Sequence, residues 1–347
     1  MPATAPAERT SPRSGGHADP LLVLLHIPKT AGMTLAGILQ YQYGDAFSGG
    51  VGESRLQPDS HRMPNVFSRP QYVEERLRSL GAKGTVRALS GHLTFGYADR
   101  LPASSRWVTV LREPVERTLS QYYYFVDPPP RRSGRPGAGF VPPWLPVPTS
   151  ALTLEEALTE RGYIPPNLQT RMLCGLVSPY DPLPDGALEQ AKRNLDERFA
   201  YVGTTERFTE LLALMSFELG WPTVAYKRSN ANPKRPKRDD LAPETLRVVE
   251  ERNALDRELH AHAGALLDEA VARRGPELAE EIEVLKLAEE RRRSKTAPDP
   301  RSLPTEARVE LALKEGELAE ARIQVKRAKS KARYRPDRRP WWRRIAR

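Results

Sequence analysis

The segment LLVLLHIPKTAGMT at residues 21–34 constrains the fold of this chain more than any other. Its apolar half has the length of a buried strand, Pro28 ends it, and a helix-like pattern begins near Met33. A helix N-terminus presents backbone N–H groups without intrahelical partners, and its dipole attracts negative charge. With Lys29 in the turn, the segment predicts a strand–turn–helix unit that binds a phosphate-like anion.

Length and composition limit the class of protein. The chain has 347 residues and 39% hydrophobic residues, enough for one large α/β domain with an appendage, or for two domains. A single cysteine, Cys174, excludes an internal disulfide framework and argues against a cysteine-based zinc site. No apolar run approaches the ~20 residues that span a bilayer. Residues 1–20 have no apolar signal core, so we expect a disordered leader and a protein of the reducing cytosol.

Strand and helix patterns alternate along residues 21–219. This alternation predicts a parallel sheet with helices on both faces, a P-loop-like three-layer α/β/α domain. Besides the first strand, we expect strands at 85–89, 106–111 and 200–203, an irregular stretch at 45–70, a helix at 150–161 capped by Thr153, and one long helix at 243–272. The predicted divisions are a leader at 1–20, the main domain at 21–272, and a charged helical extension at 273–347 that lies outside the core.

The first three predicted strands each end at a residue that can carry chemistry. These residues are Lys29, His92 and Arg112, and ligands of parallel α/β sheets bind beyond the carboxyl ends of the strands. In an ATP-binding Walker A loop the lysine follows the glycines, whereas here Lys29 precedes Gly32 in a shorter loop. Such a loop suits one tetrahedral anion better than a triphosphate. The alternative is an ordinary surface lysine.

Arg112 stands between a predicted strand and a predicted helix that begins at Pro114. Its guanidinium can donate two hydrogen bonds to a phosphate, and the hydroxyl of Ser120 on the following helix can add a third donor. The alternative is an ion pair of Arg112 with Glu113 or Glu116.

His92 is a candidate general base because the pKa of a histidine lies near neutrality. The alternative is a structural role, which is more common for a single histidine. His26, also at a predicted strand end, precedes the lysine turn directly and is expected to support it.

Five segments of the sequence resemble motifs of one enzyme family. HIPKTAGMT (26–34) resembles the 5′-phosphosulfate motif of PAPS-dependent sulfotransferases, and VTVLREPVERTLSQYYYF (108–125) resembles their 3′-phosphate motif. SGHLTFGYADRLP (90–102) is similar to the base-bearing segment of the branch that includes the heparan sulfate 2-O- and 6-O-sulfotransferases and bacterial relatives. NLQTRMLCG (167–175) and FAYVGTTERF (199–208) are similar to later segments of that branch.

The resemblance covers roughly residues 21–238 and implies an O-sulfotransferase that uses PAPS as co-substrate and needs no metal. It implies that Lys29 stabilises charge on the departing oxygen and that His92 deprotonates the acceptor hydroxyl. Arg112 and Ser120 would hold the 3′-phosphate. The 5′-phosphate would be held by Lys29 together with Thr30, Ala31, Gly32, Met33 and Thr34.

Two positions depart from the pattern of this family. Met33 stands where a small residue is frequent, and Ser90 stands where the heparan 2-O branch has a second histidine. The second departure leaves one candidate base and weakens any transfer of that acceptor specificity. The acceptor we expect is a hydroxyl of a carbohydrate or glycoconjugate. The basic stretches Arg131–Arg135 and Lys227–Arg238 would suit an anionic glycan if either borders the site; the alternative is ordinary solvated charge.

The net charge of +10 is concentrated at the C-terminus. Residues 325–347 hold eleven Lys or Arg and one acid, Asp337, and they include Trp341 and Trp342. Such a tail suits peripheral contact with a membrane, or it is simply a solvated basic end; nucleic acid is not an expected partner. Two alternative functions stay open from the sequence alone: a small-molecule or nucleotide kinase, and a non-enzymatic anchoring protein that acts through its C-terminal helices.

Overall fold

A five-stranded parallel sheet forms the centre of the molecule, in the order β2-β3-β1-β4-β5. The computed structural model describes residues 20–51, 70–126, 151–158, 164–222, 226, 235–294 and 303–333. The strands are β1 (Leu22–Leu25), β2 (Phe47–Val51), β3 (Ala88–Gly91), β4 (Arg106–Leu111) and β5 (Phe199–Thr204). Central β1 pairs in parallel with both β3 and β4, so the predicted parallel sheet is confirmed.

The edge strand β2 was not expected. Its sequence FSGGV lies in the stretch predicted to be irregular, because two glycines hide the strand pattern. Phe47 pairs with Ala88 of β3, and the pairing register shifts before Val51. An edge strand needs only one paired side, so this position tolerates a sequence that an inner strand does not.

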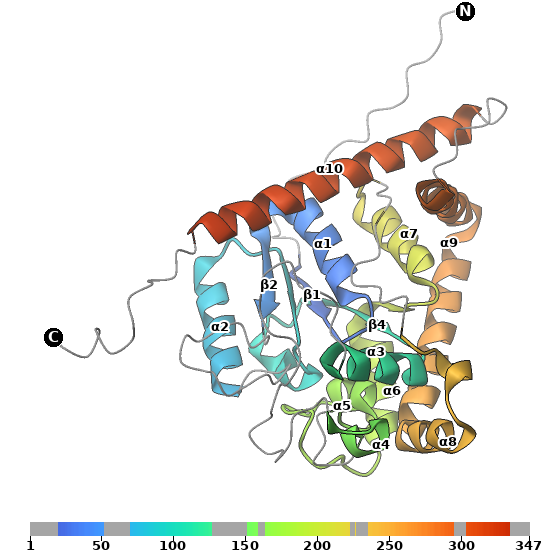
Figure 1. Cartoon of the computed structure of the whole chain (residues 1–347). Helices are drawn as coiled ribbons and strands as arrows, with labels where there is room; N and C mark the ends of the chain where they lie inside the picture. The colour runs from blue at the N-terminus through green and yellow to red at the C-terminus, as the bar shows by residue number, and fades with distance from the viewer. Residues whose placement is uncertain are drawn as a thin grey trace, which may run out of the picture.

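Helices cover both faces of the sheet (Figure 1). On one face, Val23 and Leu25 pack with α2 (Pro70–Lys83), α5 (Leu168–Leu173) and α6 (Ala187–Arg198). On the other, Leu22 and Leu24 pack with residues of α1 (Gly32–Tyr43) and α7 (Phe208–Leu219). Successive side chains of β1 therefore point alternately into two hydrophobic cores, one on each face of the sheet. The predicted three-layer α/β/α architecture is confirmed.

A smaller hydrophobic cluster lies around α3 (Pro114–Val126), α4 (Leu154–Ala157) and α8 (Pro243–Arg252). Thr153 caps α4 through the predicted capping box with Glu156. The predicted helix at 150–161 is confirmed only over the four residues of α4, and 159–163 lie outside the described residues.

The long helix predicted at 243–272 is two helices. α8 ends at Arg252, and α9 (Ala254–Ser294) begins after Asn253. α9 is broken at Gly275, where φ is 66° and ψ is −154°, so the boundary predicted at 272/273 lies close to the point where its two helical parts meet. Beyond the kink, Leu278, Ile282 and Leu285 are buried in the core on the α1 side of the sheet. The expectation that this part lies outside the core is therefore wrong: a few large apolar residues on one face suffice to bury it.

α10 (Leu303–Arg333) packs across α1 and α9 at the edge of the molecule (Figure 1). The basic tail beyond Arg333, with both tryptophans, lies outside the described residues. Among the helices that the structure describes, none combines the length and the apolar character that crossing a membrane requires.

Candidate active site

The turn after β1 has two residues in a left-handed backbone conformation. φ is 71° at Lys29 and 61° at Ala31, values that non-glycine residues rarely adopt and that store strain. The hydroxyl of Thr30 donates to the carbonyl of Ile27 at 2.9 Å and holds the turn. α1 begins at Gly32, and no described side chain caps it. The N–H group of Thr34 donates to the Ala31 carbonyl at 2.8 Å, and the start of the helix before it is where an anion can bind.

Residue 32 has to be a glycine because the His26 ring packs closely against its backbone. A Cβ atom at this position would lie 1.8 Å from Cδ2 of His26. His26 is fully buried at the end of β1, and its ring centroid lies 4.5 Å from that of His92. The glycine of the turn thus makes room for a histidine pair that joins the ends of β1 and β3.

The two histidines of this pair differ in burial. Burial, and secondarily the charges of His92 and Lys29, lower the pKa of His26 well below 6.5, so its imidazole is neutral at physiological pH. Its Nδ1 is buried without a hydrogen-bond partner among the described residues. His92 is half-buried and is the member of the pair with access to solvent. Of the two, His92 is therefore the more accessible side chain.

Arg112 directly follows β4 and connects two of the predicted motifs. Its Nη1 donates to the carbonyl of Lys29 at 3.2 Å. Its own backbone is clamped by Gln169, whose side chain accepts from the Arg112 N–H and donates to the Arg112 carbonyl, both at 2.9 Å. Gln169 is fully buried. The site therefore depends on a residue that sequence reasoning missed, although it lies in the segment 167–175 that carried part of the resemblance.

One face of α3 runs past the lysine turn. Glu116, Ser120 and Tyr124 follow each other at four-residue spacing, so they share a face of this helix. Glu116 pairs with Arg112 at 3.3 Å, and the Lys29 Nζ lies 4.0 Å from the centroid of the Tyr124 ring. Ser120 falls between these two contacts. The structure therefore brings Lys29 and Arg112 into contact, and Ser120 lies on the same face of α3 as Glu116, the ion-pair partner of Arg112. The phosphate-binding role of these three residues stays a prediction.

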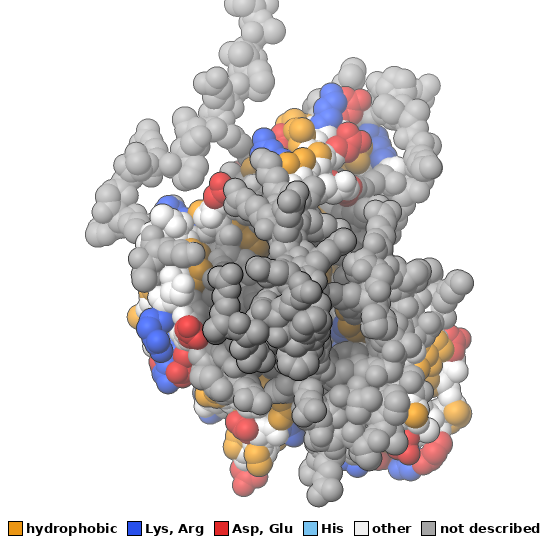
Figure 2. Space-filling view, turned by 60° about the vertical axis from the view of Figure 1, so that its left-hand side comes forward, with side chains coloured by type: hydrophobic (Ala, Val, Ile, Leu, Met, Phe, Trp, Pro, Cys, Tyr) orange, Lys and Arg blue, Asp and Glu red, His pale blue; other side chains and the backbone are white. Residues whose placement is uncertain are grey.

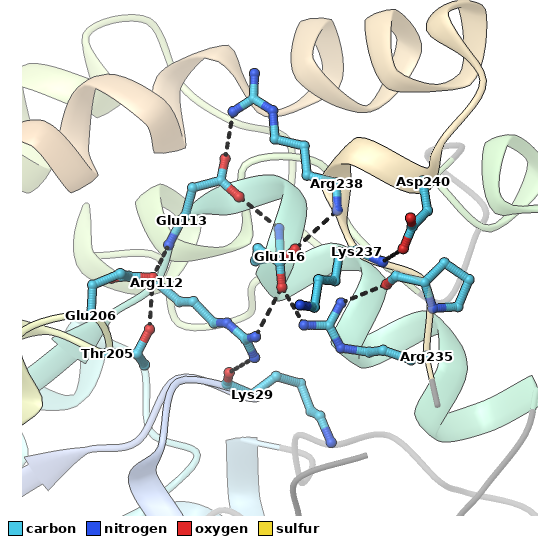
Figure 3. Close-up of polar contacts among 11 residues, drawn as sticks. Lys29, Arg112, Glu113, Glu116, Thr205, Glu206, Arg235, Lys237, Arg238 and Asp240 are labelled. Carbon is cyan, nitrogen blue, oxygen red and sulfur yellow. Dashed lines mark hydrogen bonds and ion pairs between the residues drawn. The ribbon is translucent and has the colours of Figure 1, made fainter. Parts of the chain in front are cut away.

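Glu116 also contacts two basic residues of the segment that precedes α8, Arg235 and Arg238 (Figure 3). Its carboxylate accepts from the Arg235 guanidinium and from the Arg238 backbone N–H, the latter at 3.1 Å. Burial raises the pKa of Glu116, but these hydrogen bonds and the charges of Arg235 and Arg112 outweigh it and lower the pKa below 4.5. Of the two ion-pair partners considered for Arg112, the structure selects Glu116. The guanidinium that is predicted to hold a phosphate is thus already paired with a carboxylate.

Glu113 and Glu206 organise the start of α3. The Glu113 carboxylate accepts from the Glu116 N–H at 2.8 Å and lies 3.6 Å from Arg238. The Glu113 N–H donates to Glu206 at 3.2 Å, just past the end of β5. Of the two basic stretches considered as rims, the described part of 227–238 borders the site through Arg235 and Arg238. Residues 227–234 and 131–135 lie outside the described residues.

A parallel sheet with helices on both faces, and with Lys29, His92 and Arg112 near its carboxyl edge, defines the class of protein: a three-layer α/β/α domain of the kind that binds ligands beyond the ends of its strands. A model of the galactose-3-O-sulfotransferase family matches residues 2–312, and the chain belongs to that family. No curated protein matches the chain.

Membership of this family makes the protein an enzyme, a sulfotransferase, and implies PAPS as co-substrate and a carbohydrate hydroxyl as acceptor. The predicted enzyme class is confirmed, and the kinase alternative has no support. The matching family is not the heparan sulfate 2-O/6-O branch, so the resemblance holds at the level of sulfotransferases only.

Proposed function

We propose that the protein transfers the sulfuryl group of PAPS to a galactose hydroxyl of a glycan or glycoconjugate. The assignment of PAPS as donor is supported by the contact between the two phosphate motifs, in which the Arg112 side chain donates to the backbone carbonyl of Lys29. Each motif alone is a weak pattern, but both at one sheet edge form two anion sites next to each other. The family match supports the carbohydrate acceptor and suggests its 3-hydroxyl.

In this proposal the chain's own residues divide the work. The first-turn N–H groups of α1 and the hydroxyl of Thr34 hold the 5′-phosphate, and Arg112 with Ser120 holds the 3′-phosphate. His92 takes the proton of the acceptor hydroxyl as the new sulfur–oxygen bond forms. The bond between sulfur and the phosphate oxygen breaks, and Lys29 stabilises the charge left on that oxygen. Positioning and electrostatics suffice for such a transfer.

Glu116 gives the 3′-phosphate site a way to recognise its ligand. The guanidinium groups of Arg112 and Arg235 contact the same Glu116 oxygen. A phosphate that binds Arg112 therefore either replaces this carboxylate as its partner or binds Arg235 as well. The carboxylate holds two like charges together while no anion is bound. We expect PAP, which carries the 3′-phosphate, to bind more tightly than the analogue without it.

Isothermal titration with PAP and with 3′-dephosphorylated PAP tests the donor. We expect PAP to bind better than its analogue, and Arg112→Ala to remove most of that difference. The matched control is Arg247→Ala, because Arg247 is an exposed arginine paired within α8. Equal binding of both ligands to the wild-type protein would contradict the 3′-phosphate site, and no binding of PAP would contradict the donor.

Labelled PAPS with galactose-terminated acceptors tests the acceptor and the catalytic residues. We expect label on galactose but not on its 3-deoxy analogue. Lys29→Ala should reduce turnover by about 100–1000-fold and His92→Ala by about 100–10,000-fold. Lys286→Ala, at an exposed i,i+3 ion pair on α9, is the control. Transfer to the 3-deoxy sugar would contradict the acceptor position and leave the donor assignment standing.

A further inference from the structure

α10 has an inner face that attaches it to the domain. Val309, Ala312, Gly316 and Ala319 are buried, and most of these side chains are small, so the helix lies close to its neighbours. At its middle, the Tyr41 hydroxyl of α1 donates to the carboxylate of Glu315, and the Arg322 guanidinium lies 5.3 Å from the Tyr41 ring centroid. α10 is therefore a fixed part of the molecular surface.

The opposite face of α10 carries three exposed large apolar side chains. Leu311, Leu318 and Val325 are 58%, 50% and 53% exposed. They follow each other at intervals of seven residues, so they form one stripe along the helix, which we call the outer stripe. Figure 2 shows hydrophobic side chains among charged ones on the upper surface of the molecule, and Figure 1 shows α10 along that upper edge with the sheet and the other helices on one side of it.

The charges of α10 are divided between its two halves. Residues 303–320 hold five glutamates and two basic residues, whereas residues 321–333 hold six basic residues and no acid. Two copies of this helix in antiparallel orientation place the acidic half of each against the basic half of the other. If the two antiparallel helices cross at Leu318, Leu311 of one helix lies opposite Val325 of the other. The apolar residues and the charges therefore both favour the antiparallel arrangement.

We propose that the outer stripe of α10 pairs antiparallel with the outer stripe of a second copy of this chain, forming a two-fold symmetric dimer. Leu318 lies at the axis, and Leu311 contacts Val325 of the partner subunit. The family match ends at residue 312, so two of the three stripe residues lie beyond it. The proposal is independent of the donor and the acceptor.

Sedimentation of the full chain over a wide range of concentrations tests the dimer. We expect a mass that rises toward twice the 39.0 kDa of one chain. Leu318→Glu should abolish this rise, because it places two carboxylates at the axis. The control Leu287→Glu changes a leucine of α9 that is 37% exposed and lies outside the stripe, and it should leave the dimer intact. A monomer at every concentration, or a dimer of Leu318→Glu as stable as the wild type, overturns the proposal.

Cysteine pairing tests the orientation. The native Cys174 is buried and distant in sequence, so a new cysteine on the outer stripe reports the pairing. A mixture of Leu311→Cys and Val325→Cys proteins should form a mixed disulfide dimer faster than either protein alone. Faster pairing of each protein with itself overturns the antiparallel arrangement. Binding of monomers to anionic vesicles, lost in Leu318→Glu, would instead assign the stripe to a membrane and also overturn it.

Discussion

At the scale of single residues, Gly32 links the anion turn to the candidate base. Any side chain here enters the space of the His26 ring, which in turn lies against His92. We expect Gly32→Ala to destabilise the fold by about 1–3 kcal/mol, the usual cost of overpacking, and to reduce sulfuryl transfer more than tenfold. Urea unfolding and a labelled-PAPS assay measure the two effects.

The same substitution at another glycine supplies the control for this prediction. Gly264 lies in α9, and a Cβ there meets no atom within 4 Å. Gly264→Ala should therefore stabilise the protein by up to about 1 kcal/mol with full activity. A Gly32→Ala protein as stable and active as the wild type would show that the histidine pair does not need its present packing.

Among single residues, those that follow a predicted strand could be selected from the sequence as candidates for the site. Lys29, His92 and Arg112 were predicted because each stands within a few residues of the end of a predicted strand. Gln169 was not, since a glutamine in a short helix gives no pattern of its own and acts only through the backbone of Arg112, which lies 57 residues away in the sequence. Contacts of that kind depend on the tertiary fold.

At the scale of elements, Gln169 connects α5 to the end of β4. We expect Gln169→Leu to leave both backbone groups of Arg112 unpaired at a cost of about 1–3 kcal/mol for each. PAP affinity should fall about tenfold or more, because the guanidinium loses its fixed position. Gln190→Leu, on the partly exposed surface of α6, is the control for size and polarity. Unchanged PAP binding in Gln169→Leu would show that Arg112 is positioned by other contacts.

The Glu206 carboxylate joins β5 to α3 and α9 and predicts a pH effect. It contacts the Glu113 N–H, the Thr205 hydroxyl and His260. Burial raises the pKa of Glu206, but the hydrogen bonds from His260, from its own backbone and from Glu113 outweigh it and lower the pKa from 4.5 to about 2. A carboxyl with a lowered folded-state pKa stabilises the protein above pH 4.5, and that contribution is lost as the pH falls toward 2.

Glu206→Gln should therefore lower the free energy of unfolding at neutral pH by about 1–2 kcal/mol, an amount reduced by solvent screening because the group is partly exposed. The difference from the wild type should shrink as the pH falls from 4.5 toward 2. Denaturant unfolding at several pH values measures it. A difference that stays constant over this range would mean that Glu206 acts through its shape and not through its charge.

At the scale of the whole molecule, the layers could be predicted but the role of the C-terminal helices could not. The strands predicted at 106–111 and 200–203 are indicated by short apolar patterns and correspond to β4 and β5, whereas the sequence of α9 beyond its kink is typical of a charged surface helix. Leu278 and Ile282 are buried in the same hydrophobic cluster as residues of α1 and α7, a tertiary contact that no local pattern reports. The domain therefore extends through segments that composition assigns to an extension.

α9 is also tied to α5 by reciprocal capping. The Asn167 side chain, at the start of α5, accepts from the backbone N–H groups of Leu255 and Asp256. The Asp256 carboxylate, at the start of α9, accepts from the N–H groups of Gln169 and Thr170 at 3.0 and 2.7 Å. Each helix thus supplies the cap of the other, and the clamp on Arg112 is fixed to the start of α9.

Asp256 is the residue whose loss should disturb the whole molecule most. It is fully buried; burial raises its pKa, while the nearby charge of Arg117 and the hydrogen bonds from Thr170 and Gln169 oppose this. Arg117 is itself fully buried, and burial lowers its pKa to about 10 against the opposing effect of Asp256, so it keeps its charge at neutral pH. Removing the carboxylate leaves this buried charge without the nearby opposite charge of Asp256 and the α5 N–H groups without an acceptor.

We therefore expect Asp256→Ala to destabilise the protein by about 3–5 kcal/mol, and Asp256→Asn, which keeps one amide oxygen as an acceptor, by less. The control Asp268→Ala removes an exposed partner of Arg207 on the same helix and should change stability by at most about 1 kcal/mol. Urea unfolding measures all three free energies. Equal losses for Asp256→Ala and Asp268→Ala would show that the α5–α9 junction does not contribute to the stability of the fold.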